Sequence, residues 1–293
     1  MKNLVFLSGD FSSGSTLLWT LFRQTGDFHC LYEPLHERLR EFMIYPLRAY
    51  EHHFFSENYF REYKGYKEIF NLHKEKWGKN DFYLDEKSNS PDLLAYLHYI
   101  IGMSFSRKDN VVLQFNRVAF KLSWLKRNFP SVPIIEIVRD PDKQWNSIVK
   151  RSQNHHGRED VGQETVNFMG MGMANWCNQL QQYFPELRPE NSNTGYERFL
   201  KLYNLSREQH NKYADLSIRF EDLTSNFEVE GKKIFDLVGY NDDIMHLKQF
   251  VIPPSEQKPI GSQTNAVKRK FFEKIDKAGF LYARLILRLM DLR

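Results

Sequence analysis

The sequence predicts an α/β protein in which a central, mostly parallel sheet of about five strands is flanked by helices. Short β-rich apolar runs recur along the chain, and longer amphipathic segments lie between them. Gly and Pro are spread between these elements without pooling into a linker, and no internal repeat is evident. We therefore expect residues 1–293 to form a single domain.

Each expected element follows from its pattern of apolar residues. The expected strands, which are short runs rich in apolar and β-branched or aromatic residues, are Asn3 to Ser8, Phe82 to Leu84, Val111 to Gln114, Ile134 to Val138 and Leu216 to Phe220. The expected helices, which repeat apolar residues every three or four positions, are Ser15 to Gln24, Pro91 to Phe105, Pro141 to Arg151, Glu164 to Tyr183, Glu228 to Val238 and Ala266 to Asp291. The stretch from Glu37 to Lys79 is crowded with Tyr, Phe and charged residues, and we interpret it as helical insertions.

Composition excludes several classes of protein. A chain of 293 residues with 41% apolar and 15% aromatic side chains is able to bury a large core, which argues against a disordered or fibrous protein. The 41 Lys and Arg against 37 Asp and Glu give a net charge of only +4. This balance is too mild for a typical nucleic-acid-binding face, so we expect a small anionic ligand and no nucleic acid.

The two cysteines, Cys30 and Cys177, supply neither a disulfide framework nor a cysteine-based zinc site, and they indicate a reducing compartment. The apolar stretch at the N-terminus, Leu4 to Leu7, is too short for a signal-peptide core, and no run approaches the roughly 20 residues that span a bilayer. We expect a soluble, cytoplasmic protein without a transmembrane segment, unless a targeting segment has been removed. The two adjacent histidine pairs, His52 with His53 and His155 with His156, do not face one site on a helix, so we expect no metal.

The first chemical motif runs from Leu4 to Leu21, LVFLSGDFSSGSTLLWTL, a strand followed by a Gly and Ser loop and a helix that starts near Ser15. Such a loop presents unpaired backbone N–H groups and the positive end of the helix dipole to an anion. Gly9 to Thr16 has the glycine and threonine spacing of a nucleotide-triphosphate loop, but Ser15 stands where that loop has its lysine. The segment therefore predicts a phosphate site that lacks the key cation of an ATPase or GTPase.

A second motif, SVPIIEIVRDPDKQWNSIVKRS, gives an apolar strand that ends in Arg139 and Asp140, followed by a helix that carries Ser147. Pro141 stands at a first helical position. Arg139 lies at the carboxyl end of its strand, where open α/β sheets bind ligands. A guanidinium there and a hydroxyl two helical turns on are a plausible pair for a phosphate monoester, although RDP can also be a simple ion pair at a helix start.

Three blocks in this order, SSGSTLL, IIEIVRDPDKQWNSI and LSIRFEDLTSNFEVEGKKIFDLVGY, together resemble the sulfotransferase family that uses 3′-phosphoadenosine 5′-phosphosulfate (PAPS). The resemblance implies a single α/β domain that passes a sulfuryl group from PAPS to an acceptor hydroxyl or amine, without a metal. It also implies 3′-phosphoadenosine 5′-phosphate as the product, and we expect a carbohydrate, lipid or small-metabolite acceptor.

The resemblance implies roles for residues at matching positions. It places the 5′-phosphosulfate on the loop that contains Ser12, Ser13, Gly14, Ser15 and Thr16. It places the 3′-phosphate on Arg139 and Ser147, and it implies a structural role for the block from Arg219 to Leu223.

The chain departs from the family where members usually carry Lys or Arg, immediately before the SG of the loop, because Ser12 stands there. Lys87, in YLDEKSNSP at the end of a predicted strand, is the first candidate to replace this cation. The acceptor hydroxyl needs a general base. Glu33 in CLYEPLH resembles the acidic position of glycan-modifying members, His36 is the alternative base and Glu86 is a third.

Two alternatives remain. Ser12 is compatible with a protein of the same fold that binds the nucleotide but is catalytically impaired, and the loop spacing is compatible with a P-loop kinase that has an altered loop. The C-terminal FLYARLILRLMDLR is an amphipathic helix that docks on the domain, or else serves a homodimer or a membrane-surface contact.

Overall fold

The computed structural model describes residues 3–45, 58–156 and 172–251, all of which belong to the first of two compact units, Met1–Ile252. The second unit is Pro253–Arg293. The expected helix from Ala266 to Asp291, and with it the expected dimer contact, lies outside the described residues.

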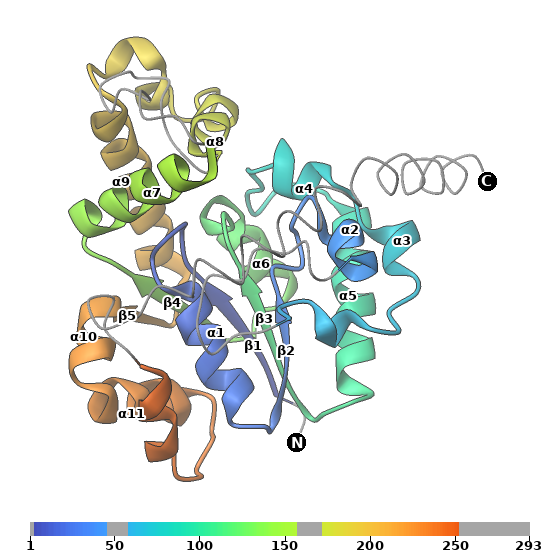
Figure 1. Ribbon diagram of the computed structural model, residues 1–293. Coiled ribbons are helices and arrows are strands. Elements are labelled where there is room, and N and C mark those ends of the chain that lie inside the picture. Colours follow the sequence, from blue (N-terminus) through green and yellow to red (C-terminus); the bar gives the residue numbers. More distant parts are fainter. Residues whose placement is uncertain (1–2, 46–57, 157–171, 252–293) are drawn as a thin grey trace, which may run out of the picture. The chain divides into compact units, whose positions relative to one another are not determined.

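Within the described residues the sheet has five strands in the order β2-β3-β1-β4-β5, and every neighbouring pair is parallel (Figure 1). The strands are β1 (Asn3–Ser8), β2 (Phe28–Tyr32), β3 (Asn110–Phe115), β4 (Ile134–Val138) and β5 (Leu216–Arg219). The predicted α/β class is confirmed. Strands β2 and β3 lie on one side of β1, and β4 and β5 lie on the other, so the strand order reverses at β1. The carboxyl end of a strand at such a reversal is the usual ligand crevice of open α/β sheets.

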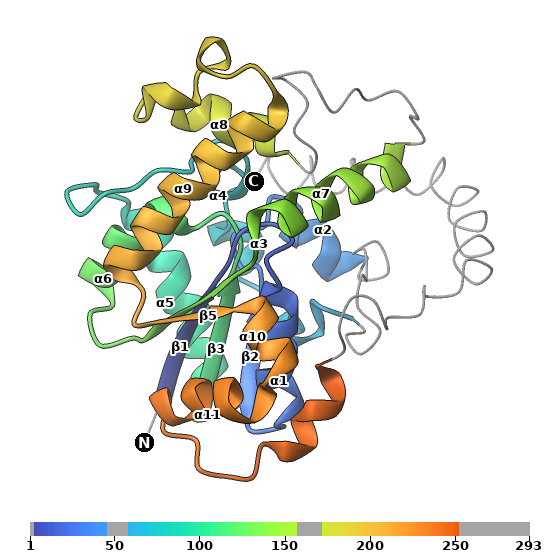
Figure 2. The same cartoon turned by 90° about the vertical axis from the view of Figure 1, so that its left-hand side faces the viewer.

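Helices cover both faces of this sheet. The longer ones are α1 (Ser15–Gln24), α5 (Pro91–Phe105), α6 (Leu122–Asn128), α7 (Pro141–His156), α8 (Met173–Leu180), α9 (Gly195–Tyr213) and α11 (Phe227–Leu237). The short ones are α2 (Leu39–Ile44), α3 (Ile69–Leu72), α4 (Lys76–Lys79) and α10 (Phe220–Ser225). Helices α1 and α11 lie on one face, where Phe22 meets Phe235, and α5 and α6 lie on the other (Figure 2).

Most of the expected elements are confirmed. The bounds of β1, β4, α1 and α5 are as predicted, and the described part of Glu37 to Lys79 contains the short helices α2, α3 and α4 with turns between them. Helix α7 extends beyond Arg151, and β5 ends one residue early because Phe220 begins α10. Helix α8 is shorter than predicted at its carboxyl end, while part of the predicted amino-terminal portion lies outside the described residues.

The expected strand from Phe82 to Leu84 is wrong. The segment is not a strand, and the Leu84 amide donates instead to the carbonyl of Phe120, in a 3₁₀ turn beside the sheet. The sheet contains instead the strand β2, which the sequence did not predict. Its FHCLY sequence lacks β-branched residues, although all five of its residues are buried. Helix α9 was also not predicted, because its apolar residues are diluted by many charged ones.

In the part of the chain that the structure describes, two apolar clusters form the core. The larger surrounds the sheet and contains Trp19 and Trp124. The smaller contains Trp145, Trp176 and Phe199 and joins α7, α8 and α9. Cys30 and Cys177 are both buried and free. None of the helices in the described ranges has the length and apolar character needed to cross a bilayer.

Candidate functional site

The loop between β1 and α1 is shaped to leave backbone N–H groups unpaired. Gly14 caps α1 with φ at 107°, no side chain caps the helix, and no acidic residue lies in its first turn. Ser12 also has a positive φ, 62°. A Cβ built on Gly14 would lie 2.3 Å from Cδ2 of Phe220, so both the backbone angle and the packing require glycine. The first turn of α1 is therefore open to an anion.

The hydroxyls of the loop divide into two kinds. Ser12 Oγ and Ser13 Oγ are buried, and neither has a hydrogen-bond partner among the described residues. Ser15 Oγ donates to Asn116 Oδ1 at 2.9 Å, and Thr16 Oγ1 lies 2.9 Å from the hydroxyl of Tyr32. Buried hydroxyls are normally paired, so the two free ones mark the place where ligand oxygens fit.

Arg139 reaches the loop from the end of β4. Its Nη1 donates to the Ser12 carbonyl at 3.2 Å, and its guanidinium lies 4.8 Å from the centre of the Phe220 ring. Its Nε is buried without a partner among the described residues. Burial lowers the pKa of Arg139 from its usual value, and Glu221 opposes this effect. The structure thus brings Arg139 to the loop, and half-buried Ser147 lies on α7, which begins just beyond Arg139.

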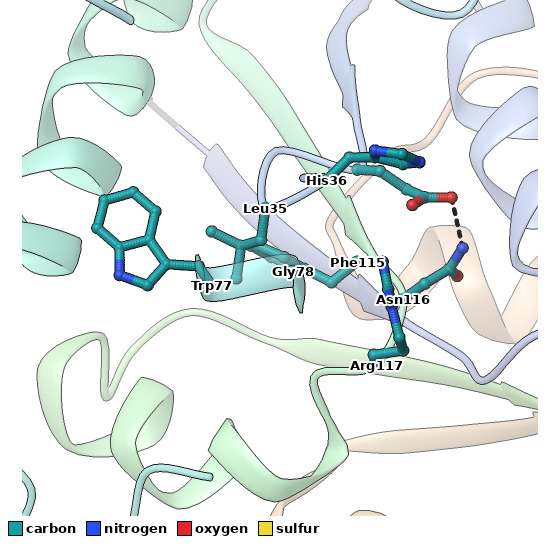
Figure 3. Close-up of a pocket in the computed structure, with 8 residues that line it drawn as sticks. Leu35, His36, Trp77, Gly78, Phe115, Asn116 and Arg117 are labelled. Carbon is teal, nitrogen blue, oxygen red and sulfur yellow. Dashed lines mark hydrogen bonds between the residues drawn. The ribbon is translucent and has the colours of Figure 1, made fainter. Parts of the chain in front are cut away.

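Glu33 follows the last residue of β2 and has a left-handed backbone, with φ at 41°. Its carboxylate is mostly buried, and Oε1 accepts a hydrogen bond from Nδ2 of Asn116 (Figure 3, dashed line). Asn116 Oδ1 accepts from Ser15 Oγ and, at 3.0 Å, from Nε2 of Gln114. A continuous hydrogen-bond network therefore joins the loop to Glu33.

A pocket opens beside this network (Figure 3). Its lining residues are Glu33, Leu35, His36, Trp77, Gly78, Phe115, Asn116 and Arg117. Nδ1 of His36 accepts from the backbone N–H of Arg38 at 3.0 Å. Burial lowers the pKa of His36, which favours a neutral ring at pH 7. Glu33 and His36, the two bases suggested by the sequence, thus line the same pocket.

Arg117 is a cation that the sequence analysis missed. Its guanidinium lies 5.0 Å from the centre of the ring of Phe11, a loop residue, and Nη2 donates to Glu37 Oε2 at 2.8 Å. Among the eight lining residues, Arg117 alone carries a permanent positive charge. Both Arg117 and Asn116 follow β3. Their position at the carboxyl end of a predicted parallel strand is the sequence signal that could have identified them as site residues.

Glu86 and Lys87 lie elsewhere. Both are exposed in a turn, where the Lys87 amide donates to Asp85 and the Glu86 carbonyl accepts from Arg127. Arg127 is in the last turn of α6, and neither Glu86 nor Lys87 lines the pocket that contains Glu33. The geometry does not support Lys87 as the replacement cation or Glu86 as a base.

The model described as the Sulfotransferase family matches residues 5–243, which include the loop, Glu33, Arg117 and Arg139. This chain belongs to the sulfotransferase family. A search of curated proteins found no match. Within the part of this sulfotransferase that the structure describes, no group of three or more His, Cys, Asp or Glu is placed to hold a metal ion.

Proposed function

We propose that this chain transfers the sulfuryl group of PAPS to a hydroxyl of a carbohydrate, lipid or small-metabolite acceptor. The observation that carries the proposal is the meeting of an anion loop and a buried carboxylate at one edge of the sheet. Ser12 and Ser13 offer hydroxyls that have no partner within the described residues, and Glu33 is joined to the same loop through Asn116.

The residues present fit the donor. The open first turn of α1 and the hydroxyls of Ser12 and Ser13 would hold the 5′-phosphosulfate, while Arg139 and Ser147 would hold the 3′-phosphate. The buried Nε of Arg139 has hydrogen-bonding capacity to offer a phosphate. PAPS supplies an activated sulfuryl group when it is bound.

Glu33 is the proposed general base. Its carboxylate takes the proton of the acceptor hydroxyl as the acceptor oxygen bonds to sulfur, the bond from sulfur to the 5′-phosphate oxygen breaks, and 3′-phosphoadenosine 5′-phosphate leaves. Glu33 suits this role because Asn116 fixes its carboxylate in the pocket. His36 is the alternative base, since it lines the same pocket and burial keeps its ring neutral.

Arg117 is the proposed replacement for the cation missing at Ser12. It packs on Phe11 of the loop and lines the pocket that holds Glu33, so it stands between the donor and acceptor sides. By analogy with loss of an oxyanion donor, such a preorganised charge contributes about 3 kcal/mol to the transition state, or ~10² in rate.

The direct test uses radiolabelled PAPS with a panel of hydroxyl acceptors, and the formation of 3′-phosphoadenosine 5′-phosphate measures turnover. Glu33→Gln is expected to lower turnover ~10² while nucleotide affinity stays near that of the wild type, because proton transfer acts mainly in the transition state. If Glu33→Gln retained turnover and His36→Ala abolished it, the base would be the histidine. Retention in both variants would show that neither residue is the base.

Paired variants decide between the two cations. Arg117→Ala is expected to lower turnover ~10², and Lys87→Ala is expected to leave it unchanged. Arg117→Lys keeps a charge at the same place and should restore part of the rate. Loss of turnover in Lys87→Ala with a normal rate in Arg117→Ala would reverse the assignment.

Ser12 motivates a second candidate function, nucleotide binding without catalysis. In that case 3′-phosphoadenosine 5′-phosphate binds, but no acceptor in the panel is sulfated. A kinase with an altered loop is a third candidate, and it predicts that ATP raises the thermal stability more than 3′-phosphoadenosine 5′-phosphate does.

A further inference from the structure

Asn116 makes three hydrogen bonds that fix the orientation of its amide. The carbonyl Oδ1 accepts from Ser15 Oγ at 2.9 Å and from Gln114 Nε2 at 3.0 Å. The amino Nδ2 donates to Glu33 Oε1. The bond to the Glu33 carboxylate requires the amino group on that side, because the reversed amide would turn Oδ1 toward the carboxylate.

The place of Asn116 in the fold explains why it can bridge these groups. It follows β3, which lies between β2 and β1 in the sheet, so it stands between Glu33 after β2 and Ser15 at the start of α1. Glu33 has a backbone φ of 41°, an uncommon angle for a residue other than glycine. Such a backbone persists only where its surroundings hold it, and the Asn116 bond holds the side chain.

We propose that Asn116 is a positioning residue that holds the Glu33 carboxylate toward the acceptor and ties its placement to the phosphosulfate loop through Ser15. The inference rests on the proposed function, because it assigns Asn116 a role in the same reaction. The amide acts on Glu33 in two ways: it fixes one carboxylate oxygen, and it donates a hydrogen bond to the charged form.

Other titratable groups also surround Glu33. His36 lies on its own turn, Tyr32 precedes it on β2, Tyr63 lies in the 3₁₀ turn Arg61–Tyr63, and Arg117 lines the shared pocket. A test of Asn116 must therefore change the bond to Glu33 while leaving these groups in place.

Asn116→Asp meets that condition, because Asp has the same shape and still accepts from Ser15 and Gln114. It replaces the donor that faces Glu33 with a carboxylate oxygen. In PAPS turnover we expect kcat at pH 7 to fall at least ~10-fold, with the affinity for 3′-phosphoadenosine 5′-phosphate within about 3-fold of the wild type. The loss should fall on kcat, because the introduced carboxylate faces Glu33 in place of the amide donor while the nucleotide loop keeps its contacts.

Asn128→Asp is the matched control. Asn128 also donates its side-chain amide, to the Trp124 carbonyl, but it lies at the end of α6, away from the pocket. We expect this variant to lose some stability and to keep the kcat of the wild type. An unchanged kcat in Asn116→Asp would overturn the inference, while absence of turnover in the wild-type protein would overturn the proposed function.

A second measurement needs no turnover. The free energy of unfolding in urea is measured for Asn116→Asp, Glu33→Gln and the double variant at pH 7. The double variant exchanges the two partners, because the amide introduced at position 33 would donate to the carboxylate introduced at position 116. It should therefore be more stable than the two single changes predict by addition. Additive effects would show that residues 116 and 33 are not coupled and would overturn the inference by themselves.

Discussion

Gly14→Ala offers the most detailed test of how the loop is built, because the structure specifies two separate penalties for a side chain there. The backbone φ of 107° is left-handed, which costs an L-residue about 1 to 2 kcal/mol. The new Cβ would also lie 2.3 Å from Phe220 Cδ2 and 3.2 Å from Ile137 Cδ1. Phe220 is mostly buried under the Arg139 guanidinium, so it cannot move without disturbing Arg139.

Overpacking of this kind costs about 1 to 3 kcal/mol. The two penalties together predict that Gly14→Ala lowers the free energy of unfolding by about 2 to 5 kcal/mol. Gly26→Ala is the matched control, since Gly26 also has a positive φ, 78°, but no heavy atom lies within 4 Å of its built Cβ. It should lose only about 1 to 2 kcal/mol from the backbone penalty.

Urea unfolding at pH 7 gives the free energy of unfolding of both variants, and a thermal-shift titration with 3′-phosphoadenosine 5′-phosphate gives their affinity for the nucleotide. Gly14→Ala should also bind the nucleotide more weakly, because a displaced Phe220 would move Arg139. Phe220→Leu introduced into Gly14→Ala should recover part of the stability, since it removes the ring atoms that clash. Equal losses in Gly14→Ala and Gly26→Ala would refute the packing argument.

Two further predictions concern buried polar groups. Ser13→Ala removes a buried hydroxyl that has no partner within the described residues, so the free energy of unfolding should change by less than about 0.5 kcal/mol. Calorimetry should show that the variant binds 3′-phosphoadenosine 5′-phosphate ~5-fold more weakly. A large loss of stability would show that the hydroxyl has a structural partner. Burial lowers the pKa of His73 to about 3, so the folded protein binds fewer protons than the unfolded chain and loses about 1.4 kcal/mol per pH unit as pH falls below ~6.5. His73→Phe, which keeps a ring against Trp77 and Tyr96, should reduce that slope in urea unfolding between pH 6 and 4, and an unchanged slope would contradict the assignment.

The sequence predicted those parts of the site whose geometry is local. The loop before Ser15 and the step from β4 to Arg139 each lie within a few residues of a strand that apolar pattern alone identifies. Glu33 and His36 could be proposed, but the strand that positions them, β2, could not, because its five residues lack β-branched side chains and form a strand through pairing with β3 and burial.

The missed residues depend on lateral neighbours in the sheet. Asn116 and Arg117 matter because β3 pairs with both β1 and β2, and strand order is not encoded by residue spacing. Lys87 was expected at the end of a strand from Phe82 to Leu84, and this strand does not form. The Leu84 amide bonds to the Phe120 carbonyl instead, and Lys87 lies in an exposed turn outside the pocket that contains Glu33.

The central claim is that the loop and Arg139 bind a nucleotide with phosphates at both the 5′ and 3′ positions. Calorimetry with 3′-phosphoadenosine 5′-phosphate and adenosine 5′-phosphate, on the wild-type protein and on Arg139→Ala, tests it most directly. The account predicts that the wild type binds the 3′-phosphorylated nucleotide at least ~10-fold more tightly, since a charged hydrogen bond contributes about 1.5 to 3 kcal/mol, and that Arg139→Ala removes the difference. Equal affinity of the wild type for the two nucleotides would contradict it.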